Sequence, residues 1–305
     1  MKKKLQIDKL KAAKIIEKQI QFCLKIKLSE SELHPLRLVQ ASKSLIGLNL
    51  DEPNQKLMNF NSVYLESFKE LKNELNINKN LELNPVIDIR DLEIAFLNKD
   101  RKKVLDTYCQ LRLVSSELHI LEFLIEISLK QSGESFLLIW SLYKSVLFLK
   151  NKESIDYIIY ALDAIMCDQF EEINIPSNSL EFIDILNYDL TCSDLDLLSH
   201  LVEAYNANLV RDIKIRFLIQ SLINKKFTKL KLNNFNHNSE VANKNLLENG
   251  RKDLLSIINS TEILDLTSEF ILLVDSIRSL MRYIDEQNHK KICLHLENIL
   301  EKINV

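Results

Sequence analysis

Glu286 and His289 are the pair of residues in this sequence whose types and spacing best suit a metal ion. Residues three apart share one face of a helix, so a carboxylate and an imidazole at this spacing can bind the same ion. A helical di-iron site needs a second such pair and two further carboxylates, and the sequence lacks the second pair. His295 and Glu297 are two residues apart and point to different faces. We therefore expect no metal site.

A second acidic group is the segment Asp168-Gln169-Phe170-Glu171-Glu172. It resembles the aspartate-rich motif of class I terpene synthases, which are all-helical, and Arg282-Tyr283 is similar to the Arg-Tyr pair near that family's C-terminus. The resemblance implies carboxylates that bind magnesium, which in turn holds a substrate diphosphate. The sequence departs from the family because Cys167 occupies the leading acidic position and no acceptable second metal motif follows. An all-helical enzyme with a metal-dependent or isoprenoid-type pocket is therefore an alternative, and we assign no cofactor.

Nucleophilic catalysis has no local signature in this chain. No serine lies in a Gly-x-Ser-x-Gly turn, and the cysteines form neither a Cys-x-x-Cys pair nor a zinc-finger spacing. We assign no catalytic residue and expect a protein that is not an enzyme. The five cysteines are spread through apolar helical patterns, which is typical of reduced core residues in a cytoplasmic protein: Cys23, Cys109, Cys167, Cys192 and Cys293.

Two further patterns bear on localisation. The basic start of the chain looks like the n-region of a signal peptide, but charged residues follow it where an apolar stretch would be needed. The most apolar segment, Phe136 to Leu149, is too short to span a bilayer and contains Lys144. We expect a cytoplasmic protein without a membrane span.

Charge is strongly segregated along the chain, although the formal net charge is only −3. Twelve acids and no lysine or arginine occur between residues 153 and 210, which we call the acidic stretch. Segments 1–27 and 211–231 are basic, with nine lysines in the first and seven lysines or arginines in the second. Separation on this scale predicts opposed electrostatic patches. The acids that we expect to form a partner-binding face are Asp163, Asp168, Glu171, Glu172, Asp194 and Asp196.

This charge pattern favours a protein–protein interaction module, such as an adaptor, scaffold, chaperone or regulatory subunit, that docks a basic protein partner on an acidic helical face. The acidic and basic segments could instead neutralise each other within one molecule or in a head-to-tail homo-oligomer. A nucleic-acid-associated factor that uses segments 1–27 and 211–231 is a further alternative. The near-neutral total charge and the isoelectric point of about 6.1 argue against nucleic acid.

Glycine scarcity sets the fold class. Only Gly47, Gly133 and Gly250 occur, too few for the tight turns of a multi-stranded sheet or for a phosphate-binding loop. Apolar residues recur at three- and four-residue steps through most of the chain, which predicts an all-α protein of about a dozen helices. We expect serial helical bundles or an irregular α-solenoid. Phe136 to Leu149 is apolar on nearly all sides, so we expect a central helix with Trp140 buried.

Two polar breaks, near 77–87 and 232–243, suggest three parts. These are an N-terminal basic helical segment at 1–76, a central bundle at 88–231 that contains the acidic stretch, and C-terminal helices at 244–305. The sequence Ser-Glu-Leu-His occurs at residues 31–34 and again at 116–119, each time before an expected helix. This recurrence indicates either a degenerate helical repeat or simply two good helix starts.

Overall fold

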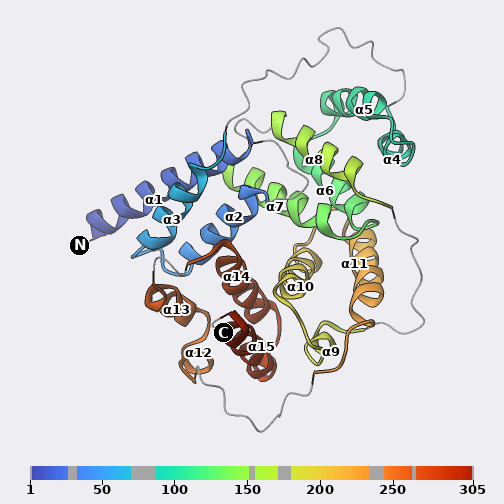
Figure 1. Ribbon diagram of the computed structural model, residues 1–305. Helices are drawn as coiled ribbons and strands as arrows, with labels where there is room; N and C mark the ends of the chain where they lie inside the picture. The colour runs from blue at the N-terminus through green and yellow to red at the C-terminus, as the bar shows by residue number, and fades with distance from the viewer. Residues whose placement is uncertain are drawn as a thin grey trace.

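The computed structural model describes residues 2–26, 33–69, 87–150, 155–170, 180–233, 244–262 and 266–303. Apart from one antiparallel bridge between Tyr188 and Leu232, the regular secondary structure of these residues is helical (Figure 1). The first helices are α1 (Lys2–Cys23), α2 (Pro35–Ile46), α3 (Gln55–Leu65), α4 (Ile89–Leu97), α5 (Arg101–Val114), α6 (Glu117–Ser128), α7 (Glu134–Leu149) and α8 (Ile155–Cys167). The later ones are α9 (Phe182–Ile185), α10 (Cys192–Tyr205), α11 (Asp212–Phe227), α12 (Lys244–Asn249), α13 (Leu254–Ser260), α14 (Ser268–Tyr283) and α15 (His289–Ile303), with short 3-10 helices η1 (Gly250–Asp253) and η2 (Glu286–Asn288). The all-α class and the expected number of helices are confirmed.

Side chains with short polar groups fix where several helices begin. Asp88 accepts a hydrogen bond from the backbone N–H of Arg90 at 2.9 Å, and Asp100 accepts one from Lys103 at 3.0 Å. Ser116 caps α6 in the same way through the N–H of His119. Each cap satisfies a backbone donor that has no partner inside its own helix.

The Ser-Glu-Leu-His recurrence does not place its residues in equivalent positions. In the second copy Ser116 is the N-cap and α6 begins at the next residue. In the first copy the N-cap is the histidine, His34, and α2 begins at Pro35. Residues 31 and 32 of that copy lie outside the described residues. The structure therefore gives no support to a repeat.

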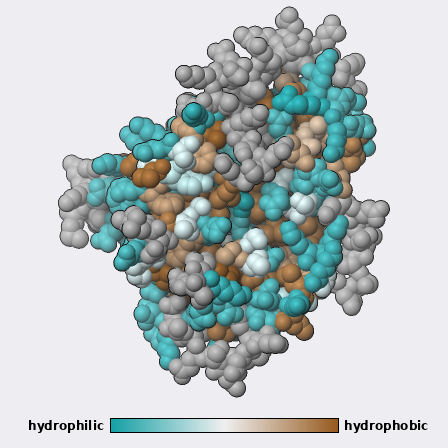
Figure 2. All heavy atoms as spheres, in the orientation of Figure 1, coloured by the Kyte–Doolittle hydropathy of each residue, from teal (hydrophilic) through white to brown (hydrophobic). Residues whose placement is uncertain are grey.

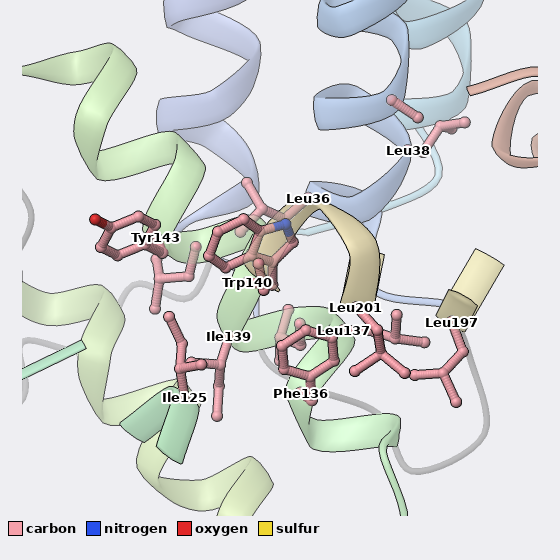
Figure 3. Packing of buried hydrophobic residues seen from close by; sticks show 14 of the residues in the cluster. Leu36, Leu38, Ile125, Phe136, Leu137, Ile139, Trp140, Tyr143, Leu197 and Leu201 are labelled. Atoms are coloured by element: carbon pink, nitrogen blue, oxygen red, sulfur yellow. The ribbon is translucent and has the colours of Figure 1, made fainter. Parts of the chain in front are cut away.

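Helix α7 lies at the centre of the core, as expected, and packs against α6, α2, α8 and α10. Trp140 is buried, with 3% of its surface exposed. Its ring stacks on Phe136 at 6.4 Å and on Tyr143 at 5.4 Å between centroids (Figure 3). Gly133, at φ +101°, lets the chain turn sharply from α6 into α7.

Helix α14 is the second organising element, because it lies between α2 and α10 (Figure 1). The C-terminal part of the chain thus packs directly on the N-terminal part, and the buried hydrophobic residues form one cluster that runs from Ala12 to Ile299. The predicted breaks lie mostly on residues 70–86 and 234–243, which are outside the described residues, so the division into three parts stays a prediction.

The outer surface mixes polar and apolar side chains. Figure 2 shows hydrophilic residues spread over one face, with hydrophobic residues between them. Among the described helices, none is both long enough and apolar enough to cross a bilayer.

Two histidines are buried in the neutral form. His34 accepts at Nδ1 from the N–H of Leu36, and its Nε2 lies 3.2 Å from the carbonyl oxygen of Ile26, so Nε2 carries the proton. His295 is 1% exposed and its Nε2 donates to the carbonyl oxygen of Leu186 at 3.0 Å. Burial lowers the pKa of both rings to about 4, because a charged imidazole would lose its hydration.

These histidines predict that the protein loses stability as the pH falls from about 6.5 towards 4. The unfolded chain binds protons in this range while the folded rings do not, so falling pH favours unfolding. Each ring contributes a loss of about 2 to 3 kcal/mol at pH 4.5, from a pKa that is lowered from 6.5 to about 4. Urea unfolding at pH 7 and pH 4.5 measures the loss.

His295→Gln should show a smaller loss of stability between the two pH values than the unsubstituted protein. His119→Gln, which removes an exposed histidine, is the control. Equal losses in all three proteins would show that the ring of His295 does not contribute, and a proton NMR titration of His295 gives the same answer if the variant is too unstable to measure.

Candidate functional site

A cleft of about 1630 Å³ opens where the end of α2, the middle of α7, the end of α10, η1 and the end of α14 meet. Its lining contains seven lysines or arginines and four acids, an excess of three positive charges in a chain whose net charge is −3. The cations are Lys43, Lys144, Arg251, Lys252, Arg278, Arg282 and Lys290, and the acids are Glu203, Glu248, Asp285 and Glu286. This cleft is the candidate site.

The floor of the cleft is organised by the carboxylate of Glu203. Its Oε2 accepts hydrogen bonds from Trp140 Nε1 at 3.1 Å and from Lys144 Nζ at 2.8 Å, and its Oε1 accepts from Arg278 Nη2 at 2.9 Å. Arg278 Nε also donates to Asp275 at 2.5 Å. Burial alone would raise the pKa of Glu203, but the surrounding cations, Lys144 first among them, hold it well below 4.5. Glu203 is therefore ionised, and together with Asp275 it neutralises Lys144 and Arg278 on the floor.

Helical spacing brings these groups together. Trp140 and Lys144 are four residues apart on α7, so both face α10 at neighbouring turns. Asp275 and Arg278 are three residues apart on α14 and face the same helix. Glu203 lies in the last turn of α10 and joins the two sets.

Among the described residues, three cations of the walls lack a carboxylate partner of this kind. Within the described part of the chain, no carboxylate forms an ion pair with Lys43, Arg251 or Arg282. Lys43 lies over the ring of Phe148 at 5.1 Å, and Arg282 over the ring of Tyr283 at the same distance. These contacts leave the positive charges without a counter-charge.

The pKa values of two of these cations are lowered by burial and by neighbouring positive charges. Burial lowers the pKa of Arg251, and the charges of Arg282 and Arg278 lower it further. Burial and the charge of Lys144 lower the pKa of Lys43 to about 8, although Asp275 and Glu203 act in the opposite direction. Like charges are held close together here, so an anion in the cleft would relieve their repulsion.

Comparison with known proteins does not identify the chain. No protein-family model, no curated protein and no solved structure matches it.

The predicted acidic face is not the site that the structure assembles. Asp163 pairs with Arg101 through two contacts of 3.0 and 3.1 Å, and Asp168 accepts a hydrogen bond from Ser132 at 3.1 Å. Asp194 completes a capping box with Thr191.

Asp196 is buried and forms an ion pair with Arg37, so it does not lie on an exposed face. Glu171 and Glu172 lie outside the described residues.

The basic segment 211–231 also has an acidic partner within the chain, which lies on α6. Glu126 is fully buried and pairs with Arg211 and Lys214 of this segment and with Lys130. Arg211 Nε donates to its Oε2 at 2.6 Å. The exposed basic surface that a nucleic-acid contact would need is reduced accordingly.

The other candidates from the sequence are Glu286, His289 and the Arg282-Tyr283 pair. Among the described residues there is no group of three or more histidines, cysteines or acids that could hold an ion. His289 Nε2 donates to the carbonyl oxygen of Ile284 at 3.0 Å, and Glu286 is exposed. Arg282 and Tyr283 contribute to the cleft instead.

Removal of the Glu203 charge should destabilise the fold. In Glu203→Gln, Lys144 and Arg278 keep their buried charges but lose the anion between them, and breaking a buried ion pair in this way costs about 3 to 5 kcal/mol. Urea unfolding at pH 7 measures the change. The matched control is Glu248→Gln, because Glu248 is an exposed acid of the same cleft. Equal stability of the two variants would contradict a structural role for Glu203.

Proposed function

We propose that the protein is a binding protein for a multiply charged anion, which the cations of the cleft hold. The observation that carries this proposal is the unpaired state of Lys43, Arg251 and Arg282 beside a floor that Glu203 already neutralises. Guanidinium groups recognise phosphate and carboxylate through paired N–H donors, and they keep their charge throughout the physiological pH range. The cleft therefore offers donors for an anion that the described residues do not supply.

The volume of the cleft suits an anion that carries several charged groups. A drug-sized ligand occupies a pocket of roughly 300 to 1,000 Å³, whereas this cleft measures about 1630 Å³. The wall cations come from three different elements, α2, η1 and α14, so they surround the space instead of forming one row. Phosphate and carboxylate groups share the chemistry that these side chains recognise, and the test compares them.

Tripolyphosphate and citrate, at constant ionic strength, should raise the melting temperature of the protein. A ligand that binds only the folded state at 100 times its Kd stabilises it by about 2.7 kcal/mol. In the double variant Arg251→Glu, Arg282→Glu the stabilisation should disappear, since two donors become acids that repel the anion. The control is Lys102→Glu, a charge reversal on the exposed face of α5, outside the cleft.

Isothermal titration calorimetry with each anion gives the Kd and shows whether phosphate or carboxylate is preferred. If neither anion stabilises the protein, or if the double variant responds as strongly as Lys102→Glu, the cleft is not an anion site.

Docking of a basic protein partner on the acidic stretch stays a separate prediction. Reversal of Asp168, Glu171 and Glu172 to lysine should abolish capture of such a partner and leave the melting temperature nearly unchanged, because acids that serve a docking face contribute little to stability. Capture that survives both the reversal and high salt would exclude this face. A loss of folding would instead show that these acids stabilise the molecule internally.

A further inference from the structure

Lys43 differs from the other cations of the cleft in its surroundings. It lies in the last turn of α2, partly buried, with its amine over the ring of Phe148. Within the described residues no carboxylate forms an ion pair with it. Lys144, by contrast, is bound to Glu203 at 2.8 Å, and Lys252 is exposed. Lys43 is thus an amine that lines the cleft with an aromatic ring beside it and no carboxylate bound to it among the described residues.

The charges that face Lys43 come from three helices. Lys144 on α7 and Arg278 on α14 repel a proton on its amine, while Asp275 on α14 and Glu203 on α10 attract one. The two acids are already engaged with Arg278, and Glu203 with Lys144 as well. The cations and the burial dominate, and the pKa of Lys43 is lowered to about 8. At pH 7.5 about a quarter of such amines are neutral, against about one in a thousand for an ordinary lysine.

A neutral amine in a cationic pocket is a nucleophile towards aldehydes and ketones. The amine nitrogen forms a bond to the carbonyl carbon and one of its protons passes to the carbonyl oxygen, which gives a carbinolamine. The second amine proton and the hydroxyl group then leave as water, and a C=N Schiff base remains. No oxidant or reductant is consumed. Anionic groups held by neighbouring cations would place the carbonyl beside the amine and raise its effective concentration.

We propose that Lys43 forms a Schiff base with carbonyl compounds that carry phosphate or carboxylate groups and that bind in the cleft. This inference rests on the proposed function, because Arg251 and Arg282 would hold the anionic part of the molecule. It adds a covalent step at one named atom, Nζ of Lys43. The remaining cations of the cleft act as positioning residues.

Pyridoxal 5′-phosphate, an aldehyde with one phosphate group, is a suitable probe. The full-length protein is incubated with the probe and reduced with borohydride, and the labelled lysine is identified by intact mass and peptide mapping. We expect one saturable adduct on Lys43, with at least a tenfold slower reaction for pyridoxal, which lacks the phosphate. Tripolyphosphate should protect Lys43 from labelling.

Lys43→Arg should abolish this adduct, since arginine keeps the charge but has no reactive amine. Lys102→Arg, the same substitution on an exposed lysine of α5, is the control and should be labelled like the unsubstituted protein. Circular dichroism checks that both variants are folded, and peptide mapping of the unsubstituted protein decides the question if Lys43→Arg does not fold. Labelling distributed over many lysines, with Lys43 no faster than the rest, would overturn the inference.

The outcome is separable from the proposed function. If tripolyphosphate stabilises the unsubstituted protein but Lys43 is not labelled, the Schiff base is excluded and the anion site remains. If tripolyphosphate has no effect and no adduct forms on Lys43, both proposals fail.

Discussion

The ionised side chain of Glu203 is the point at which three core helices depend on one another. It lies in a region from which water is largely excluded, and an isolated carboxylate there would be strongly unfavourable. Hydrogen bonds from Trp140 and Lys144 on α7 and from Arg278 on α14 compensate for the lost hydration. Because each donor comes from a different turn or a different helix, these bonds are compatible with only one relative position of α7, α10 and α14. That position also determines where the cleft opens and which of its cations are neutralised.

The same requirement explains how the segregated charges of the sequence are accommodated. The buried carboxylates Glu126 and Asp196 pair with Arg211 and Arg37, which come from distant parts of the chain. Long-range ion pairs of this kind neutralise acids of the acidic stretch and cations of segment 211–231. Within the described residues, three cations of the cleft, Lys43, Arg251 and Arg282, have no carboxylate partner. A local run of one sign in the sequence is therefore paired in part with distant residues of the other sign.

The helical fold could be predicted from the sequence because its signals are local. Apolar spacing and scarce glycine indicate helices, and the side chains of Asp88 and Asp100 cap helices that begin at the next residue. The expected central helix, Phe136 to Leu149, differs from α7 only by two residues at its start. The cleft could not be predicted in this way, because Lys43 and Arg278 belong to opposite ends of the chain and no spacing relates them.

The acidic face is a prediction from acids that have no cation nearby in the sequence, and pairing with distant residues is its alternative. Two of these acids have distant partners, since Arg101 is 62 residues from Asp163 and Arg37 is 159 residues from Asp196. Two cations of the cleft that have no carboxylate partner among the described residues also lie close to other cations. Lys43 and Arg251 are held beside like charges at a cost in folding free energy, which the hydrophobic packing of α2 and α14 offsets. An anion that entered the cleft would remove that repulsion. Relief of the unfavourable electrostatic energy of the unliganded fold would then contribute to the affinity for the anion. Neutralising the wall cations within the chain, as Glu203 neutralises the floor, would stabilise the protein and weaken its hold on an anion.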